Sequence, residues 1–307
     1  MGGALLAEAN DVIIIGCGPA GLSAAIYLKR ADRDFLLIEE GEPGGLVADA
    51  NFVENYIGFP EGIDGFSLRN RFLDHLRSLD IPHVESRVKK VRRLNHHFSI
   101  ETENGDYESS AVIIAAGTRP KKIRVKGAKA FEGKKVFYSL RELLLDSQID
   151  QRIIVLGGGD IAFDYAINLR TRGHRVTIIS RSVPKCLPLL RRRAEERGID
   201  LHIGYSPLEI LEKDDSIALS CDFCGEAKEI RGDKILIACG RVPNLEILDS
   251  KLRRHLYGKG LPETGIPGLY LVGDIARKRY RQIGIAIGDG LLAAMMADSF
   301  LKKRGRR

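Results

Sequence analysis

The sequence contains one structural unit twice, and this duplication restricts the fold more than any other feature of the chain. The first copy, DVIIIGCGPAGLSAAIYLKR, begins at Asp11, and the second, RIIVLGGGDIAFDYAINLR, begins at Arg152. In each copy an apolar run leads into a glycine-rich loop, and a segment with apolar residues at helical spacing follows. The pattern predicts a strand, a tight loop and a helix, which is the beginning of a βαβ unit.

The loops of both copies follow the pattern G-x-G-x-x-G/A, which is typical of dinucleotide-binding sites. Its positions are Gly16, Gly18 and Gly21 in the first copy and Gly157, Gly159 and Ala162 in the second. The first glycine permits a tight turn, the second lets the backbone approach a pyrophosphate, and the third position lets helix and strand pack closely. The N–H groups at the start of the helix then face the phosphates. Since each loop lies between a predicted strand and a predicted helix, we interpret the pair as two dinucleotide sites.

The residues at the end of the next strand predict different cofactors for the two sites. Glu39 ends the first such strand, at the distance from Gly16 where an acid accepts hydrogen bonds from a ribose. Ser180 stands at the matching distance in the second copy, and Arg181 follows it. A carboxylate suits an unmodified ribose, whereas Ser-Arg without an acid suits a 2′-phosphate. We therefore expect FAD at the first site and NADPH, in preference to NADH, at the second; the alternative for Arg181 is an ordinary surface arginine.

Three further apolar segments predict how the two sites are distributed over domains. SAVIIAAGTRP and DKILIACGRVPN each end on A-x-G before a proline, and GIPGLYLVGDI ends on Gly273-Asp274 before a last apolar helix. We expect the late strand and helix to complete the first domain. The expected layout is a discontinuous FAD-binding domain of residues 1–120 and 244–307, and an inserted NAD(P)H-binding domain of residues 121–243.

Composition is that of an ordinary globular protein, with 44% hydrophobic and 29% charged residues. No apolar run reaches the roughly 18 residues of a spanning helix, and the N-terminal residues lack the basic start of a signal peptide. We therefore expect no membrane span and a cytoplasmic location.

The net charge of +7 lies partly in clusters at 191–193, 277–281 and 302–307. They are either a solvated surface or a landing site for an acidic partner; no base-reading motif accompanies them, and we expect no nucleic-acid binding.

From Asp11 to about Leu301 the chain resembles the low-molecular-weight thioredoxin reductases, class II pyridine nucleotide-disulfide oxidoreductase-like flavoproteins. The segments that carry the resemblance are GCGPAG, GEPGGLV, ENYIGFP, AAGTRP, GGGDIAFDYA and GDIARKRYRQIGIAIGDGLLAA. The resemblance implies an α/β fold class with two doubly wound Rossmann-like dinucleotide-binding domains of the three-layer ββα type, joined by two short crossings. It also implies a homodimer, in which one domain rotates so that nicotinamide and dithiol take turns at the flavin.

The same resemblance assigns cofactor contacts residue by residue. For FAD these are Gly16, Gly18, Ala20, Gly21, Glu39, Gly45, Leu46, Asn55, Val88, Gly117, Gly273, Asp274, Arg281, Gln282 and Ile283. For NADPH they are Gly157, Gly159, Asp160, Ala162, Ser180 and Arg181. Val88 would meet the adenine, Asp274 would bond the ribityl chain, and Arg281 to Ile283 would approach the isoalloxazine.

The chain departs from the family at the redox centre. The family's C-x-x-C follows a G-x-x-V segment, here GKKVFYSLRELL, and its two cysteine positions fall on Ser139 and Glu142. Neither residue can carry a disulfide. Asp160 and Asp164 in the second copy are closer to the thioredoxin-reductase-like ferredoxin/flavodoxin–NADP reductases, which also lack the dithiol. The sequence therefore combines features of both groups.

The only C-x-x-C of the chain is CDFCG, Cys221 to Gly225, between alternating apolar segments. This pattern predicts a hairpin tip in the second domain. Four interpretations stay open: a surface turn with inert thiols, a disulfide that staples the hairpin, half of a zinc knuckle completed by another chain, or a distant substrate-reducing dithiol. Cys17, inside the first glycine loop, is either a catalytic thiol or a small buried residue. We expect no metal site within this chain alone.

These observations lead to three functional hypotheses. The first is an FAD-dependent oxidoreductase in which hydride passes from NADPH to the flavin and electrons then leave for an external acceptor, such as ferredoxin or flavodoxin. A quinone, oxygen and a distant disulfide are the other acceptors left open. The second is a disulfide reductase of the thioredoxin reductase kind, acting on a thioredoxin-like protein through Cys221 and Cys224 or through Cys17. The third is a non-catalytic flavoprotein that senses nucleotides.

Overall fold

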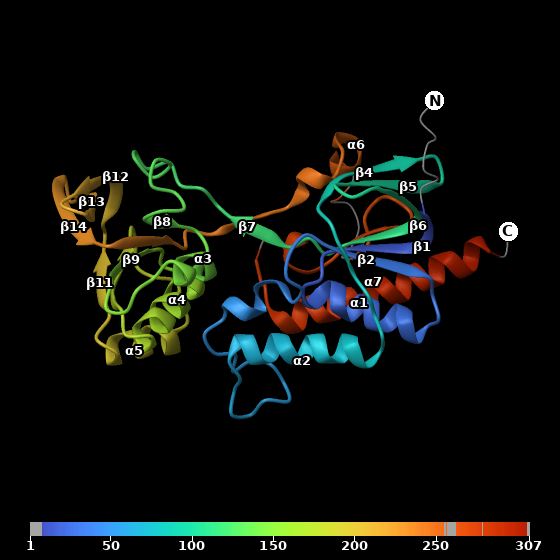
Figure 1. The fold of residues 1–307 in the computed structure, drawn as a ribbon, viewed down its shortest axis with the longest axis horizontal. Helices are drawn as coiled ribbons and strands as arrows, with labels where there is room; N and C mark the ends of the chain where they lie inside the picture. Colours follow the sequence, from blue (N-terminus) through green and yellow to red (C-terminus); the bar gives the residue numbers. More distant parts are fainter. Residues whose placement is uncertain (1–7, 255, 257–261, 278, 306–307) are drawn as a thin grey trace. The chain divides into compact units, whose positions relative to one another are not determined.

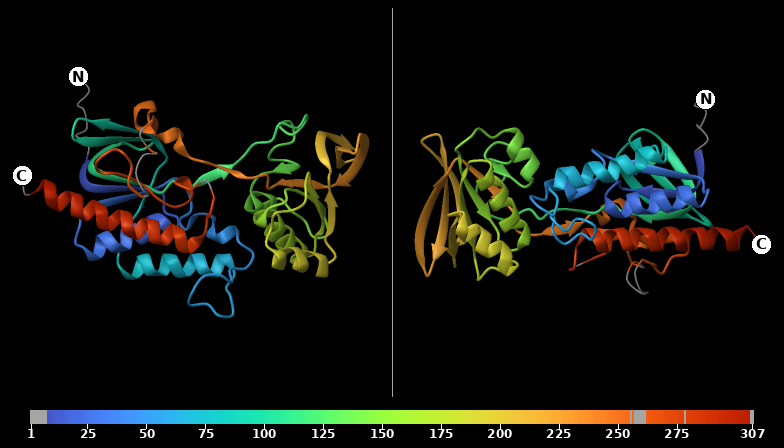
Figure 2. Two further views of the ribbon diagram at one scale, coloured as in Figure 1. Left: turned by 180° about the vertical axis from the view of Figure 1, so that it is seen from behind. Right: turned by 90° about the horizontal axis from the view of Figure 1, so that it is seen from below.

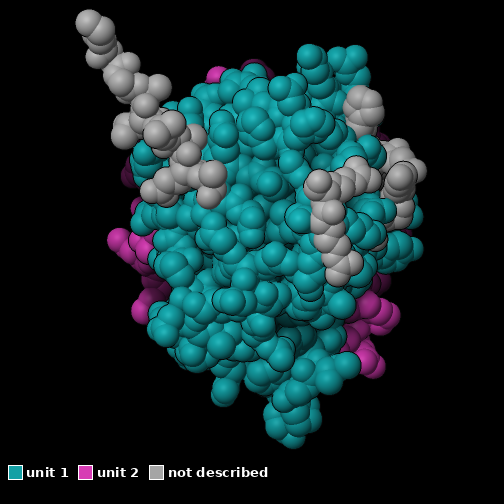
Figure 3. Space-filling view, turned by 90° about the vertical axis from the view of Figure 1, so that its right-hand side faces the viewer, with its two compact units in different colours: residues 1–48, 53–119, 243–307 teal, residues 49–52, 120–242 magenta. Residues whose placement is uncertain are grey.

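The computed structural model describes residues 8–254, 256, 262–277 and 279–305. Its chain forms two compact units, coloured separately in Figure 3: unit 1 comprises residues 1–48, 53–119 and 243–307, and unit 2 comprises residues 49–52 and 120–242. The N-terminal start, Lys278 of the second basic cluster and the last two residues of the basic tail lie outside the described residues.

Unit 1 is built on a mixed seven-stranded sheet with the order β3-β2-β1-β6-β5-β4, in which β17 also pairs with β6. The strands are β1 (Glu8–Ile15), β2 (Phe35–Glu39), β3 (Val84–Glu85), β4 (Val88–Leu94), β5 (His97–Thr102), β6 (Asp106–Ile114) and β17 (Leu269–Leu271). The first half of β6 pairs antiparallel with β5, and its second half pairs parallel with β17. The late segment 269–271 thus returns to the sheet that the N-terminal strand begins.

The helices of unit 1 are α1 (Pro19–Arg30), α2 (Gly65–Ser78), α6 (Ser250–Arg254) and α7 (Ile283–Arg304), with 3-10 turns η1 (Gly45–Asp49), η2 (Leu245–Ile247) and η3 (Gly273–Ile275). The second half of strand β1, Val12 to Ile15, is entirely apolar because both its faces are covered there. Val12 and Ile14 join the core under α1 and α7, while Ile13 and Ile15 join the core that includes β4 and β5. Such continuous apolar runs are typical of strands buried on two faces.

Helix α7 is the one helix in the described part of the chain that is long and apolar enough to cross a membrane, by length and composition alone. In the structure it runs beside α1 (Figures 1 and 2). Ala293, Ala294 and Ala297 are fully buried in the core shared with α1. Small side chains let the two helices approach closely, so burial in the core of unit 1 accounts for the alanine-rich face of α7.

Unit 2 has the three layers expected of a ββα domain. Its five-stranded parallel sheet has the order β11-β10-β9-β15-β8, and a separate antiparallel sheet has the order β12-β13-β14. The parallel strands are β8 (Val136–Phe137), β9 (Arg152–Leu156), β10 (Arg175–Ser180), β11 (Asp200–Ile203) and β15 (Lys234–Ile237). The antiparallel strands are β12 (Ser206–Lys213), β13 (Ser216–Phe223) and β14 (Glu226–Gly232), and the helices are α3 (Leu140–Leu145), α4 (Asp160–Thr171) and α5 (Pro188–Glu196).

The alternation of side chains along β9 holds these layers together. Ile153 and Val155 pack toward α4, whereas Ile154 and Leu156 pack toward the antiparallel sheet. The chain enters and leaves unit 2 through β7 (Thr118–Pro120) and β16 (Arg241–Pro243), which pair with each other. The expected α/β class and three-layer arrangement are confirmed.

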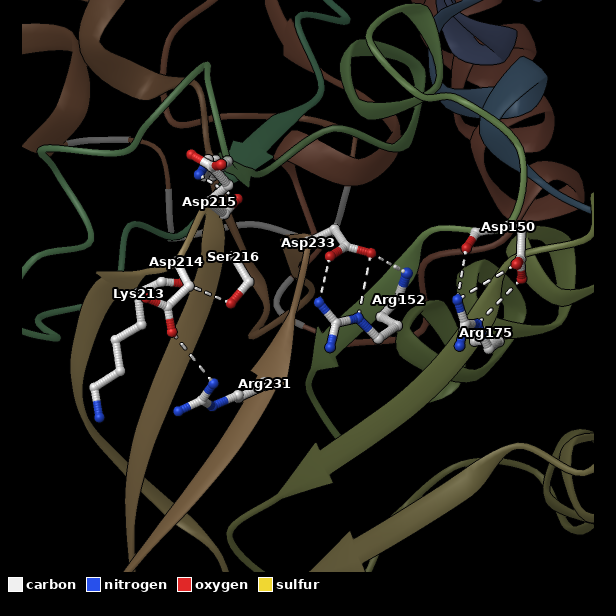
Figure 4. Close-up of polar contacts among 10 residues, drawn as sticks. Asp150, Arg152, Arg175, Lys213, Asp214, Asp215, Ser216, Arg231 and Asp233 are labelled. Carbon is white, nitrogen blue, oxygen red and sulfur yellow. Dashed lines mark hydrogen bonds and ion pairs between the residues drawn. The ribbon is translucent and has the colours of Figure 1, made fainter.

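The segment CDFCG is a hairpin tip, as the sequence predicts. Cys224 and Gly225, at φ of 54° and 86°, form the turn between β13 and β14. The preceding hairpin turns at Asp214 and Asp215, with φ of 48° and 61°. Both φ pairs are those of a turn that needs positive φ at its two central residues. In Figure 4 Asp214 faces Arg231 of β14, its carboxylate 3.8 Å from the guanidinium.

At the second central position of the turn, the second hairpin has Gly225 and the first has Asp215. A positive φ strains the backbone of aspartate but not that of glycine, so the first turn retains strain that a glycine would relieve. We predict that Asp215→Gly raises the free energy of unfolding by about 0.5–1 kcal/mol. The matched change Gly225→Asp lowers it by a similar amount. Urea denaturation of both variants measures the effect, and a destabilised Asp215→Gly variant would show that strain does not control this turn.

Candidate functional site

In unit 1, two positions of the first loop have room only for glycine. At the third position the backbone is accessible from outside the loop. A Cβ at Gly16 would lie 2.5 Å from the carbonyl oxygen of Ala115, and one at Gly21 would lie 1.8 Å from that of Gly16. Around Gly18 the nearest atom is the Cα of Gly45, at 3.9 Å. The loop thus packs tightly at Gly16 and Gly21. At Gly18 it leaves space on the side from which a pyrophosphate would approach.

The second loop, in unit 2, repeats this arrangement. A Cβ at Gly157 would lie 2.5 Å from the carbonyl oxygen of Ala238, and no atom lies within 4 Å of one at Gly159. Ala162 is fully buried against the loop. Gly18 and Gly159 are the N-cap residues of α1 and α4, and neither helix start has a side-chain cap. Uncapped N–H groups beside an open backbone suit a phosphate group.

The two strand-end residues lie where the sequence pattern places them. Glu39 is the last residue of β2, and its carboxylate accepts the N–H of Cys17 at 2.6 Å and that of Glu40 at 3.0 Å. Burial raises the pKa of this carboxyl, and the backbone donors oppose that rise. Glu39 is therefore fixed beside the glycine loop, at the end of β2.

In unit 2 the matching residue, Ser180, ends β10 and is buried, and its hydroxyl donates to the carbonyl oxygen of Ser182 at 2.6 Å. The side chain of Arg181 is exposed, and the described contacts of the chain include no hydrogen bond or ion pair for it. The following loop folds back on the glycine loop, since the N–H of Lys185 donates to the Gly158 carbonyl at 2.7 Å. The carboxylate of Asp160 accepts the N–H of Leu187 at 2.8 Å.

Several residues assigned to FAD by resemblance come together in unit 1 although they lie far apart in the chain. Gly45, with φ of +60°, packs against the first loop, where its Cβ would lie 3.1 Å from the Cα of Gly18. A Cβ at Gly273 would lie 3.0 Å from that of Ala20. The amide of Asn55 donates to the Gln282 side chain at 2.9 Å. The structure therefore brings Gly45 and Gly273 to the start of α1, and it joins the segments of Asn55 and Gln282 to each other.

The remaining predicted FAD residues lie at the following places in unit 1. Gly117 follows β6 with φ of +59°, and Ile283 is the first residue of α7. Leu46 is partly exposed beside Gly45, and Asp274 lies within η3. Val88 begins β4, two residues after Ser86, whose N–H donates to the Glu39 carbonyl at 2.8 Å. The guanidinium of Arg281 donates to the carbonyl oxygen of Arg277 at 3.0 Å.

The two positions of the family's dithiol form a helix cap in this chain. Ser139 is the N-cap of α3, and its hydroxyl oxygen accepts the N–H of Glu142 at 3.4 Å. Ser-x-x-Glu at the start of a helix is the sequence pattern of a capping box. The cysteines' places are thus occupied by residues that stabilise the helix start and carry no redox chemistry.

The five cysteines of the chain are all free, so CDFCG is not stapled by a disulfide in this structure. Cys221 is fully buried in the core between the sheets of unit 2, and Cys224 is exposed at the turn. Burial raises the pKa of the Cys221 thiol to about 11 and, together with Glu39, that of the Cys17 thiol to about 12. Within the described residues no three His, Cys, Asp or Glu side chains are grouped so that they could hold a metal ion.

Sequence patterns did not indicate two features of these sites. Lys185 has no motif of its own, and only the fold places it beside the second glycine loop. The sequence singled out Asp164 but not its partner: the Asp164 carboxylate accepts the N–H of Asn51 at 2.9 Å within unit 2. Burial raises the pKa of this carboxyl to about 6.

Comparisons with known proteins agree with this geometry. The family model for pyridine nucleotide-disulphide oxidoreductases matches residues 10–290. Thioredoxin reductase of Bacillus subtilis (strain 168) is 33% identical over 95% of this chain and 95% of its own length. The crystal structure of Lactococcus lactis thioredoxin reductase in the FR conformation superposes with a TM-score of 0.88 at 31% identity, covering 96% of this chain and 99% of that one. That of T. acidophilum thioredoxin reductase gives 0.85 at 29% identity, covering 95% and 98%.

The chain belongs to the pyridine nucleotide-disulphide oxidoreductase family, within its low-molecular-weight, thioredoxin reductase-like members. It is a flavin-dependent NAD(P)H oxidoreductase by family and fold, and the family implies FAD and NAD(P)H as cofactors. The open backbone at Gly18 and Gly159 fits such cofactors, because each loop leaves the space that a pyrophosphate needs.

The burial of Cys17 and Cys221 predicts a clear pattern of thiol reactivity. At pH 8 a thiol with a pKa of about 12 is ionised to roughly one part in ten thousand. We expect iodoacetamide to modify Cys224 and to leave Cys17 and Cys221 unmodified in the folded protein. Mass spectrometry of tryptic peptides measures this, with urea-unfolded protein as the control. Rapid labelling of Cys17 would contradict its assignment as a buried, inert thiol.

Proposed function

We propose that this protein is an NADPH-dependent FAD oxidoreductase that delivers electrons to an external acceptor rather than to a dithiol of its own. One observation carries the proposal: Ser139 and Glu142 cap α3 at the positions of the redox cysteines, while both dinucleotide loops keep their geometry. A chain that retains both cofactor sites but has no cysteine at these two positions would pass electrons from the flavin directly to another molecule.

The residues of unit 1 that would hold FAD act by shape and by fixed hydrogen bonds. Gly18 would expose its backbone to the pyrophosphate, and Glu39 would accept hydrogen bonds from the ribose, provided that its carboxyl is ionised. Gly45, Asn55 and Gln282 would line the cofactor. FAD, when bound, supplies the electron-transfer chemistry between NADPH and the acceptor.

The preference for NADPH rests on charge at the end of β10. Ser180 places no carboxylate there, so a 2′-phosphate meets no like charge from the last residue of β10. The exposed Arg181 would pair with this phosphate, and Lys185 supplies a second cation in the loop that folds back on the glycines. Arginine suits this role because its planar fork can form two hydrogen bonds with phosphate oxygens.

For the acceptor we propose an acidic one-electron carrier such as ferredoxin or flavodoxin, which the net charge of +7 would attract. Arg192 and Arg279 are exposed members of the basic clusters. Such an encounter slows as salt rises, because the Debye length shortens to about 8 Å at physiological ionic strength. A homodimer and a cytoplasmic location are part of the proposal.

The alternative acceptor is a protein disulfide, as the names of the thioredoxin reductase relatives suggest. It would need Cys221 and Cys224, or Cys17, as the reducing thiols. The burial and raised pKa of Cys17 and Cys221 disfavour this route. A third outcome, a flavoprotein that binds nucleotides without turnover, is distinguished by the experiment below.

Anaerobic stopped-flow mixing of the FAD-loaded protein with NADPH or NADH tests the proposal. We expect NADPH to bleach the flavin absorbance faster than NADH, and ferredoxin or flavodoxin to restore it at a rate that falls with salt. Absence of bleaching by either nucleotide would contradict the enzymatic proposal. Reoxidation by thioredoxin but not by the carriers would support the disulfide reductase instead.

Arg181 provides the sharpest test of nucleotide choice. We predict that Arg181→Gln raises KM for NADPH on the order of tenfold to a hundredfold, the loss expected for a charge-assisted hydrogen bond, and leaves KM for NADH unchanged. Arg175→Gln is the matched control, because Arg175 lies at the other end of β10 in an exposed pair with Asp150 (Figure 4). Equal losses with both nucleotides would refute a 2′-phosphate role for Arg181.

The cysteines of the hairpin provide a separate test of the acceptor. We predict that the double variant Cys221→Ser, Cys224→Ser keeps the wild-type rate of NADPH-dependent carrier reduction, since neither thiol lies in the electron path. Steady-state assays with the carrier and with a disulfide substrate measure this, with Cys224→Ser alone as a control for the buried substitution. Loss of turnover in the single variant would assign a redox role to the hairpin.

A further inference from the structure

A buried carboxylate in α7 joins two segments that the FAD site depends on. Asp289 is 8% exposed. Its Oδ2 accepts the backbone N–H of Gly273 at 3.3 Å, at the start of η3. Its two oxygens also accept the guanidinium of Arg277, Oδ1 from Nη2 at 2.6 Å and Oδ2 from Nε at 3.2 Å. One side chain thus contacts both the beginning of the turn and the residue two positions after its end.

Each contact leads directly to a predicted FAD residue. Gly273 precedes Asp274, and its φ of +70° gives the backbone at this point a shape that favours glycine. On the other side the carbonyl oxygen of Arg277 accepts the guanidinium Nε of Arg281 at 3.0 Å. The contacts of Asp289 therefore reach Asp274 through the backbone and Arg281 through Arg277.

The surroundings of Asp289 leave little room for movement. The next residue, Gly290, lies so close to α1 that its Cβ would be 2.0 Å from the carbonyl oxygen of Ala20. A Cβ at Gly273 would likewise lie 3.0 Å from that of Ala20. The carboxylate thus lies where α1, α7 and η3 meet, and a charge buried at such a junction is retained only when it is paired and hydrogen-bonded.

We propose that Asp289 is a positioning residue for FAD: it fixes Gly273–Asp274 and, through Arg277, Arg281, so that both segments are preorganised before the cofactor binds. The inference rests on the proposed function, because it assumes that FAD occupies unit 1. Asp289 itself touches no cofactor. Its role is to lower the free-energy cost of ordering the two segments that contact FAD.

The chain provides a matched control on the same helix. Asp298 is also buried, and its carboxylate pairs with Arg33 and Lys302, each at 2.6 Å. Its partners belong to α7 and to the segment after α1, and none of them is a predicted FAD residue. Asp289→Asn and Asp298→Asn therefore remove equivalent buried charges from α7 with different expected consequences.

The experiment measures FAD affinity by quenching of flavin fluorescence for wild type, Asp289→Asn, Arg277→Gln and Asp298→Asn, with thermal unfolding recorded at saturating FAD. We expect Asp289→Asn and Arg277→Gln to weaken FAD binding on the order of tenfold, and Asp298→Asn to lower only thermal stability. The rate of FAD release on dilution rises in the same two variants. Arg277→Gln decides the question if Asp289→Asn does not fold, because the Arg277 side chain is partly exposed.

The outcomes separate this inference from the proposed function. Wild-type affinity in both site variants, or an equal loss of affinity in Asp298→Asn, would overturn the role of Asp289 and leave the proposed function intact. A wild-type protein that binds no FAD would contradict the proposed function, and the inference would fall with it.

Discussion

The rest of the structure depends on one steric constraint, which occurs once in each unit. The carbonyl oxygen of Ala115 approaches Gly16 so closely that no side chain fits, and Ala238 does the same at Gly157. The first contact brings the end of β6 against the turn between β1 and α1, and the second brings the end of β15 against the turn between β9 and α4. The N-terminus of each helix is thereby held at the carboxyl end of its sheet, where ligands of doubly wound folds bind. Replacing either glycine would separate the strand end from the loop.

The sequence predicted this geometry well because its causes are local. Glycine spacing, apolar runs and the A-x-G strand ends each depend on a few neighbouring residues, and the structure reproduces both copies. The hairpin at Cys224 and Gly225 was predictable for the same reason. The contacts of Asp289 with Gly273 and Arg277 were not, because a lone aspartate in an apolar helix gives no motif. The same holds for Asn51 and Asp164, which lie far apart in the chain and meet only in the folded structure.

The replaced dithiol changes what the fold can do without changing the fold. Ser139 keeps the start of α3 capped, so the loss of two cysteines creates no obvious structural defect. The thiols of Cys17 and Cys221 are buried, and burial raises their pKa, which disfavours them as substitutes. The redox centre can therefore be replaced while the two cofactor sites keep their geometry. Electrons delivered by NADPH would then pass from the flavin directly to the acceptor.

Anaerobic titration of the FAD-loaded protein with dithionite tests this central claim most directly, because it counts electrons without involving a nucleotide or an acceptor. A flavin with no redox-active dithiol takes up about two electrons per FAD before the titration ends. The account predicts that complete bleaching coincides with this point and that no further equivalents are consumed. Uptake of about four electrons per FAD, with two thiols newly accessible to alkylation, would contradict it and reveal a disulfide in electronic contact with the flavin.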